Sequence, residues 1–242
     1  KYKKSKYLVL IPSFNEINNL KKFVKTLSKL IPVCILDDAS NDGTYKWLKK
    51  NKIHVYKNNK NLGYEMNLLN GIKLFKDKCE YLITFDADGQ HKLSDIKKII
   101  KKNKRFDVII CNRKNKNRIL ETIISKIFYI FFNLQDPLSG FKVYRTKIIS
   151  ETHLNQINNF FLIDFLLKFI NKNNIINMKI VTNKRNGLSR VGSTLLVNFN
   201  FLFFQTSIIL FNLFVFIVSF RENEAELKKS ILNINNIDEL TH

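Results

Sequence analysis

The segment with the most chemical content is TFDADGQH, residues 84–91, which directly follows an apolar run typical of a buried strand. Asp86 and Asp88 stand one residue apart in it. In a turn, two such carboxylates can point the same way and share a cation, and carboxylate oxygens suit Mg²⁺ or Mn²⁺. Gln90 and His91 could add a neutral ligand or a supporting hydrogen bond. The pattern predicts a metal site that would bind the phosphates of a substrate.

Two further polar clusters also follow predicted strands. Asp37 and Asp38 come after the apolar residues 33–36, and Glu16 closes the segment IPSFNE, residues 11–16. The carboxyl ends of parallel strands meet at one edge of a sheet, where α/β proteins bind ligands. We therefore expect these carboxylates to converge with the DADGQH turn and form a site for a nucleotide and a metal ion.

The cluster DDASNDGT, residues 37–44, also fits a simpler role at the start of a helix. Ser40 or Asn41 could cap the helix TYKWLKK, and Asp42 would interact favourably with its N-terminal dipole. The two roles are compatible, because one aspartate can bind a ligand while Ser40 caps the helix.

Hydrophobic periodicity places these motifs in an α/β fold with a mainly parallel sheet flanked by helices. Short apolar runs predict strands at residues 7–11, 33–36, 53–56, 81–85, 107–111, 141–145 and 178–183. Apolar residues at helical spacing predict helices at residues 17–30, 44–50, 67–75, 93–102, 123–134 and 160–170.

The chain is strongly basic, with 41 Lys and Arg against 20 Asp and Glu and a net charge of +21. Such a charge attracts polyanions, including nucleic acid, anionic lipid and phosphorylated substrates. The lysines are spread along predicted helices, and Lys, Asn, Ile and Phe are abundant together, as in AT-rich coding sequences. We therefore expect no nucleic-acid partner. Cys34, Cys79 and Cys111 lie far apart without a CxxC pair, so we expect buried thiols and no disulfide framework.

Residues 201–220 carry no charge, and a helix of that length spans about 30 Å, the thickness of a bilayer core. We expect a catalytic domain over residues 1–192, an apolar membrane-associated helix over 193–220 and a polar tail over 221–242. An interfacial helix or a buried soluble helix remains an alternative for the apolar segment.

The motifs IPSFNE, DDASNDGT, NLGYEMNLLNG and DADGQH, in this order and spacing, resemble glycosyltransferase family 2, whose catalytic domain has the GT-A nucleotide-diphospho-sugar fold. DADGQH, DPLSGFKVYR and RNGLSR further resemble the branch of dolichyl-phosphate mannose synthases and polyprenyl-phosphate glycosyltransferases. The resemblance covers about residues 7–192. The sequence lacks GxGxxG, GxxxxGK[ST] and QxxRW. These absences disfavour a Rossmann dehydrogenase, a P-loop protein and a processive polysaccharide synthase, respectively.

The resemblance implies an inverting, metal-dependent transfer from a UDP- or GDP-sugar to a membrane acceptor, with Mg²⁺ or Mn²⁺ as cofactor. It implies that the nucleotide-sugar is bound by Pro12, Phe14, Glu16, Asp37, Asp38, Asp86, Ala87 and Asp88. It implies a metal held by Asp86, Asp88 and Gln90, and phosphates bound by Arg113, Arg118, Arg185 and Arg190. The expected catalytic residues are Asp88, Asp136, Arg118 and Arg185.

The nature of the acceptor decides whether a general base is needed. A sugar hydroxyl must lose a proton to attack, and Asp136 is the candidate base, although it also fits a turn carboxylate that bonds the backbone near Pro137. A lipid phosphate is already an anion and needs cationic groups instead.

We expect a polyprenyl phosphate acceptor and a catalytic domain on the cytoplasmic face of a membrane, because basic residues flank the apolar segment. One alternative is transfer to a hydroxyl of a cell-surface glycan such as lipopolysaccharide or capsule. A more distant alternative is a non-catalytic basic protein that binds membranes or polyanions.

Overall fold

The computed structural model describes residues 5–101, 106–114, 119–149, 166 and 174–183. The chain divides into two compact units, Lys1–Asn186 and Gly187–His242, and all of the described residues belong to the first. The apolar segment 193–220, the tail 221–242 and nearly all of the expected helix 160–170 therefore lie outside the described residues. Within the part of the chain that is described, no helix is both long and apolar enough to cross a membrane.

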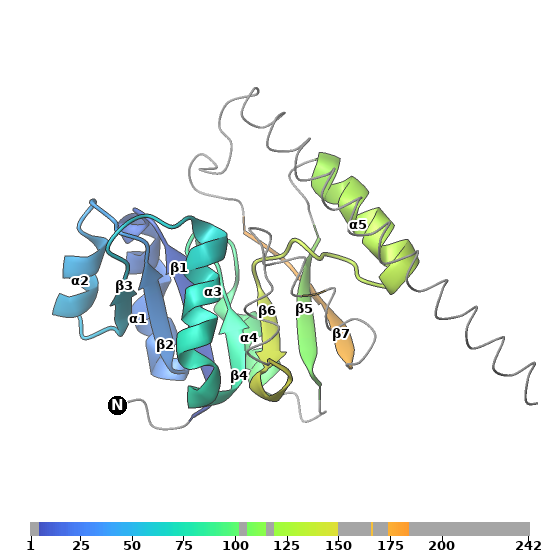
Figure 1. Ribbon diagram of the computed structural model, residues 1–242, viewed down its shortest axis with the longest axis horizontal. Helices are drawn as coiled ribbons and strands as arrows, with labels where there is room; N and C mark the ends of the chain where they lie inside the picture. The colour runs from blue at the N-terminus through green and yellow to red at the C-terminus, as the bar shows by residue number, and fades with distance from the viewer. Residues whose placement is uncertain (1–4, 102–105, 115–118, 150–165, 167–173, 184–242) are drawn as a thin grey trace, which may run out of the picture. The chain divides into compact units, whose positions relative to one another are not determined.

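The described residues form an α/β structure around a seven-stranded sheet with the order β3-β2-β1-β4-β6-β5-β7 (Figure 1). The strands are β1 (Ser5–Ser13), β2 (Val33–Asp37), β3 (Val55–Lys57), β4 (Cys79–Thr84), β5 (Val108–Arg113), β6 (Lys142–Arg145) and β7 (Ile175–Ile180). The helices are α1 (Ile17–Leu30), α2 (Thr44–Lys50), α3 (Tyr64–Phe75), α4 (Leu93–Ile100) and α5 (Ile119–Phe132), with short 3₁₀ turns η1 (Lys76–Lys78) and η2 (Thr146–Ile148).

The mainly parallel sheet that the sequence predicts is confirmed. Strands β1 to β4 pair in parallel, as do β5 and β7, and β6 runs antiparallel to both β4 and β5. The expected positions of all seven strands match within a few residues. The largest shift concerns β7, which ends at Ile180 rather than 183.

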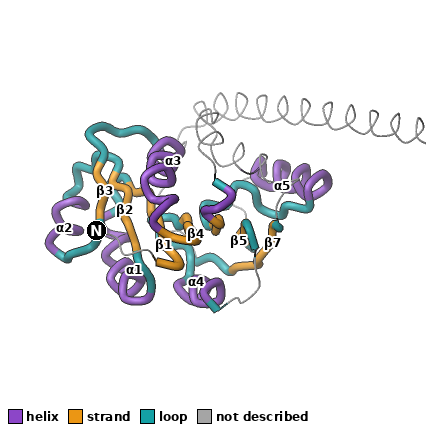
Figure 2. The backbone as a smooth tube through the Cα atoms, turned by 60° about the horizontal axis from the view of Figure 1, so that its bottom comes forward, coloured by secondary structure: helices purple, strands orange, loops and turns teal. Residues whose placement is uncertain are grey.

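Helices cover both faces of the sheet, because the central strands are apolar on both sides. On one face, Val9 and Ile11 of β1 share a hydrophobic cluster with Leu20 and Val24 of α1 and with Ile96 of α4. Helix α3 lies on the opposite side of the strands (Figure 2). The three cysteines are buried and unbonded to one another, as expected.

Helix α3 packs closely on its face of the sheet because Gly71 leaves no side chain between the two, so that the helix backbone approaches the side chain of Leu36 in β2. The helix begins at Tyr64, three residues before the start that the apolar spacing predicts. Its N-cap is Gly63, whose φ of 82° lies in the left-handed region that glycine tolerates best.

The carboxyl ends of β1, β2 and β4 lie side by side, as the sequence predicts. Ser13 is the register partner of Asp37, and the Phe85 amide donates to the Leu10 carbonyl at 3.0 Å. This edge therefore brings together the loops that follow the three strands, and all of the polar clusters singled out above begin there.

Candidate functional site

The carboxylate of Asp86 is held from three directions at the end of β4. The Tyr64 hydroxyl donates to Oδ1 at 2.8 Å, and His91 Nε2 lies 3.0 Å from Oδ2. The third direction is occupied by Gly140, where a Cβ atom would collide with the carboxylate. Burial alone would raise the pKa of Asp86, but the hydrogen bond and charge of His91 and the Tyr64 hydroxyl outweigh it and lower this pKa. The arrangement keeps Asp86 ionised.

The ring of His91 is buried between two aromatic side chains. Its centroid lies 5.2 Å from those of Phe85 and Phe141. Nε2 faces Asp86, while the buried Nδ1 has no hydrogen-bond partner among the described residues. A proton on Nε2 lets the ring donate a hydrogen bond to the Asp86 carboxylate. Of the two roles open to His91, the structure has the supporting hydrogen bond.

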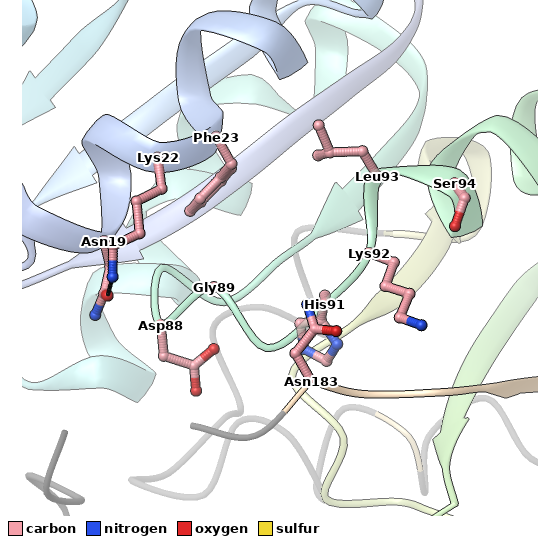
Figure 3. A pocket seen from close by; sticks show the side chains of 10 residues that line it. All are labelled: Asn19, Lys22, Phe23, Asp88, Gly89, His91, Lys92, Leu93, Ser94 and Asn183. Atoms are coloured by element: carbon pink, nitrogen blue, oxygen red, sulfur yellow. Dashed lines mark hydrogen bonds between the residues drawn. The ribbon is translucent and has the colours of Figure 1, made fainter. Parts of the chain in front are cut away.

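Asp88 lies on the wall of a cavity of about 640 Å³ between α1, the turn after β4 and Asn183 (Figure 3). The turn is closed by the Gln90 amide, which donates to Asp88 Oδ1 at 3.0 Å, and by Gly89 with a φ of 75°. Lys22 and Lys92 also line the cavity, so cations and a carboxylate share its wall.

Gln90 ties the same turn to the residues after β7. The Asn183 amide donates to the Gln90 carbonyl at 2.8 Å, and the Gln90 side-chain amide lies 3.5 Å from the Asn183 carbonyl. The role of Gln90 as a metal ligand stays a prediction. These contacts hold the turn with Asp88 against Asn183, the last described residue after β7.

The donor set is compatible with a divalent cation that a substrate helps to bind. Asp86, Asp88 and Gln90 supply the hard oxygen donors that Mg²⁺ and Mn²⁺ prefer. Among the described residues, no group of three or more His, Cys, Asp or Glu side chains is arranged to hold a metal ion alone. Mg²⁺ commonly binds proteins through one or two carboxylates plus substrate phosphates, so this sparse set fits a cation completed by a diphosphate.

Asp37 and Asp38, which the sequence groups together, have different environments. Asp38 accepts from Asn58 Nδ2 at 2.8 Å, from the Leu62 amide at 2.9 Å and from the Gly63 amide at 2.9 Å. Neither oxygen of Asp37 makes a hydrogen bond of good geometry with the described residues. Burial raises the pKa of Asp37, and the nearby Ser40 offsets only part of this effect.

The loop between β1 and α1 is fastened to the loop after β2. The Asn15 amide donates to Ser40 Oγ at 2.9 Å, and Asn15 Oδ1 accepts from the Asn41 amide at 2.8 Å. The prediction that Ser40 or Asn41 caps the next helix is wrong, because the N-cap of α2 is Gly43 and no side chain caps it. Asp42 Oδ1 accepts from the Thr44 amide, the first residue of the helix, at 2.9 Å.

The remaining residues expected to bind the nucleotide lie at the same edge. Pro12 is buried within β1, and Ala87 is buried in the turn after β4. Phe14 is 37% exposed, and the Glu16 carboxylate accepts from Asn19 Nδ2 at 2.7 Å. Their contacts with a nucleotide stay predictions.

Arg113 is clamped by two carboxylates at the end of β5. Its Nε and Nη2 donate to the two oxygens of Asp136 at 2.8 and 3.0 Å, and its backbone amide also donates to Asp136. Glu121 lies 3.3 Å from Nη2. Burial would lower the pKa of Arg113, but the hydrogen bonds and charge of Asp136, followed by Glu121, raise it. The fully buried Asp136 thus bonds the backbone of Arg113 rather than that near Pro137.

Sequence reasoning missed Tyr64, Gly140 and Lys142. Tyr64 lies in the motif NLGYEMNLLNG, and Gly140 and Lys142 lie in DPLSGFKVYR, so the motifs contain the signal, but their partners are far away in sequence. Arg118, Arg185 and Arg190 lie outside the described residues, and their phosphate-binding roles stay predictions.

Lys142 is a fully buried cation at the start of β6, next to this site. Its Nζ donates to the Ser139 carbonyl in the turn that carries Gly140. Burial lowers the pKa of Lys142 to about 8, although the charges of Asp136, Glu65 and Asp86 oppose the shift. The side chain therefore stabilises the turn behind Asp86 at the cost of placing an ammonium group in the interior.

Comparisons with known proteins show the family to which the chain belongs. Residues 8–164 match the family described as Glycosyl transferase family 2. The dolichol-phosphate mannosyltransferase of Pyrococcus furiosus is 26% identical over 67% of this chain and 53% of its own length. The undecaprenyl-phosphate mannosyltransferase of Micrococcus luteus is 23% identical over 62% of this chain and 70% of its own.

Among solved structures, the glucosyl-3-phosphoglycerate synthase of Mycobacterium tuberculosis in complex with Mn²⁺, uridine diphosphate and glucosyl-3-phosphoglycerate has a TM-score of 0.58. The alignment covers 76% of this chain and 73% of the synthase chain at 12% identity, so the two proteins share a fold.

The family match spans well over half of the chain, so the chain belongs to glycosyl transferase family 2. Its class is therefore that of the glycosyltransferases. Relatives named for transfer to dolichyl and undecaprenyl phosphates support the branch that the motifs indicate. The chain spans about half the length of several curated relatives that it matches.

We predict that Lys142→Met changes the pH dependence of stability. The folded protein releases the Lys142 proton near pH 8, whereas the unfolded chain holds it to about pH 10.5, so wild-type stability should rise by about 3 kcal/mol over this window. Met at this position has no proton to lose and should abolish that component.

The measurement is the free energy of unfolding of both proteins between pH 7 and pH 11, with the exposed Lys147→Met as control. Below pH 8 the Lys142→Met variant should be the more stable protein. Parallel pH curves for wild type and Lys142→Met would show that Lys142 stays charged in the folded state.

Proposed function

We propose that this chain transfers a sugar from a UDP- or GDP-sugar to a polyprenyl phosphate, with inversion at the anomeric carbon and with Mg²⁺ or Mn²⁺. The proposal depends above all on one observation. Asp88 lines a cavity at the carboxyl edge of the sheet, on a turn whose other carboxylate, Asp86, is fixed by Tyr64 and His91.

In this proposal, the carboxyl edge of the sheet has two binding regions. The loops after β1 and β2, with Glu16 and Asp37, would bind the base and ribose of the donor. The turn after β4, with Asp86, Asp88 and Gln90, would bind the diphosphate through the divalent cation. When bound, this cation supplies Lewis-acid stabilisation to the departing nucleoside diphosphate.

The proposed chemistry is a displacement at the anomeric carbon of the sugar. An oxygen of the acceptor phosphate forms a bond to that carbon while the bond to the nucleoside diphosphate breaks. Because the acceptor is already an anion, this chain's residues need only position it and neutralise its charge, and arginines suit that role through their bidentate donors. Arg118, Arg185 and Arg190 are our candidates.

The geometry of Asp136 supports a phosphate acceptor over a hydroxyl. A general base must reach the proton that it removes, usually at hydrogen-bond distance. Asp136 is fully buried, and both its oxygens already accept from Arg113. A lipid acceptor also agrees with the apolar segment 201–220 and with the names of the relatives. Because basic residues flank that segment, we place the proposed activity at the cytoplasmic face of a membrane.

The proposal is tested with the full-length protein in detergent, Mn²⁺, a panel of UDP- and GDP-sugars, and polyprenyl phosphate. We expect one donor to give a sugar-linked lipid phosphate. Asp88→Ala should lower turnover by at least about 100-fold with only a small loss in Tm, because the residue serves the cation and contributes one hydrogen bond to its own turn. The exposed Asp77→Asn should behave as wild type. Undiminished turnover of Asp88→Ala in saturating Mn²⁺ would contradict the proposed role.

A second experiment separates the two acceptor classes. With a lipid phosphate, Asp136→Asn should lower Tm, because it leaves Arg113 without its buried partner, yet keep kcat within about tenfold of wild type. Arg185→Ala should leave Tm unchanged and lower turnover by at least about 100-fold, since a phosphate charge loses its partner.

With a hydroxyl acceptor, Asp136→Asn should lose more turnover than Arg185→Ala, because losing a general base typically costs about 10²–10⁴-fold. Both variants are assayed on polyprenyl phosphate and on a glycan acceptor, at a temperature where Asp136→Asn is folded. A collapse of turnover in Asp136→Asn alone would favour the hydroxyl acceptor and overturn our choice.

A further inference from the structure

The loop 58–64, which we define as the residues after β3 together with Tyr64, the first residue of α3, touches both ends of the candidate site. At its beginning, Asn58 Nδ2 donates to Asp38 at 2.8 Å. At its end, the Tyr64 hydroxyl donates to Asp86 at 2.8 Å. A single short segment therefore connects a carboxylate at the end of β2 with a carboxylate at the end of β4.

Asp38 determines the path of this loop. Besides Asn58, its carboxylate accepts the backbone amides of Leu62 and Gly63, both at 2.9 Å, and the side chain is only 3% exposed. These two amides immediately precede the first residue of α3. Hydrogen bonds between an ionised carboxylate and backbone amides are about twice as strong as neutral ones, so Asp38 is well placed to fix the start of the helix.

The start of α3 in turn determines where the Tyr64 hydroxyl lies. Gly63 turns the chain into the helix with a φ of 82°, and its carbonyl accepts the Asn67 amide at 3.0 Å. Asn67 Nδ2 donates to the Leu36 carbonyl at 2.8 Å, which anchors the first turn on β2. With the backbone fixed on both sides, Tyr64 can reach Asp86 without further adjustment.

We propose that Asp38 is a positioning residue for the metal and diphosphate end of the site, acting through the loop 58–64 and the hydroxyl of Tyr64. The inference rests on the proposed function, because it takes the turn with Asp86 and Asp88 as the place where the cation and diphosphate bind. It differs from the expectation that Asp38 serves the base and ribose, since the carboxylate already bonds three donors of its own chain.

A probe without base or sugar distinguishes the two roles. We would measure binding of the Mn²⁺–pyrophosphate complex to the full chain by calorimetry, for wild type, Asp38→Asn, Tyr64→Phe and the double variant. The expected result is a three- to tenfold loss of affinity, roughly the effect of one hydrogen bond, in each single variant. The double variant should bind no more weakly than the weaker single, because both changes break the same connection.

The matched control is Asp107→Asn. Asp107 is likewise a carboxylate that accepts a backbone amide, from Asn174 at 3.1 Å, but it lies at the opposite end of β5 from Arg113. This variant should bind the complex as tightly as wild type. Unchanged affinity in Asp38→Asn, or losses in the double variant that multiply, would overturn the inference and favour a direct role for Asp38 at the base.

Gly63→Ala keeps the test decisive if Asp38→Asn does not fold. A Cβ at Gly63 meets no atom within 4 Å, so the change strains only the backbone that leads to Tyr64. It should weaken binding of the complex in wild type and have no further effect in the Tyr64→Phe background. An equal loss in both backgrounds would contradict the inference.

Different binding results would show that the proposed function itself is wrong. If wild type does not bind the complex, or if Asp88→Ala binds it equally well, the cation and diphosphate do not bind at this turn, and the proposed function fails. If wild type binds, Asp88→Ala does not, and Asp38→Asn is unchanged, only the positioning role fails.

Discussion

The carboxylate of Asp86 joins distant parts of the chain that otherwise have no reason to meet. Tyr64 reaches it from the start of α3, His91 from the turn after β4, and Gly140 closes the space behind it. This partly buried carboxylate loses some of its hydration, and the hydrogen bonds from Tyr64 and His91 compensate for that loss. The turn that carries Asp88 is therefore held to both neighbouring segments.

The surrounding sheet explains why such a site is possible at this edge. Parallel strands end at the same side, so the loops after β1, β2 and β4 come together there. The antiparallel β6 inserts beside β4 and brings the turn with Gly140 against Asp86. The Lys142 ammonium group donates to the Ser139 carbonyl of that turn, although its burial costs stability. Arg113 is held in the same region by its hydrogen bonds to Asp136.

Local patterns predicted most of the fold, because hydrophobic periodicity depends on residues near one another in sequence. The spacing of Leu20, Val24 and Leu27 defined α1 to the residue, and the apolar run before Asp86 defined β4. The same reasoning predicted that three strand ends converge. It failed for Ser40, because its partner Asn15 is 25 residues away, and a strong local capping signal concealed that long-range bond.

Long-range contacts also limited how well the candidate site could be predicted from the sequence. Residue type and spacing singled out Asp86 and Asp88 as candidates, but not the different hydrogen bonding of the neighbours Asp37 and Asp38. That difference depends on which carboxylate meets the amides of the loop 58–64, a tertiary contact that the sequence pattern does not contain. Arg113 is a similar case, since its ion pair with Asp136 bridges 23 residues.

The central claim is that a divalent cation binds beside Asp88 while Asp86 stays fixed by Tyr64 and His91. Crystals of the full chain grown with Mn²⁺ and a nucleoside diphosphate test it most directly, because the anomalous scattering of manganese locates the ion independently of the rest of the density. We expect an anomalous peak between the Asp88 carboxylate and the diphosphate, with both hydrogen bonds to Asp86 retained. A manganese ion bound away from this turn, with Asp88 making no contact to it, would show that Asp88 does not serve the cation.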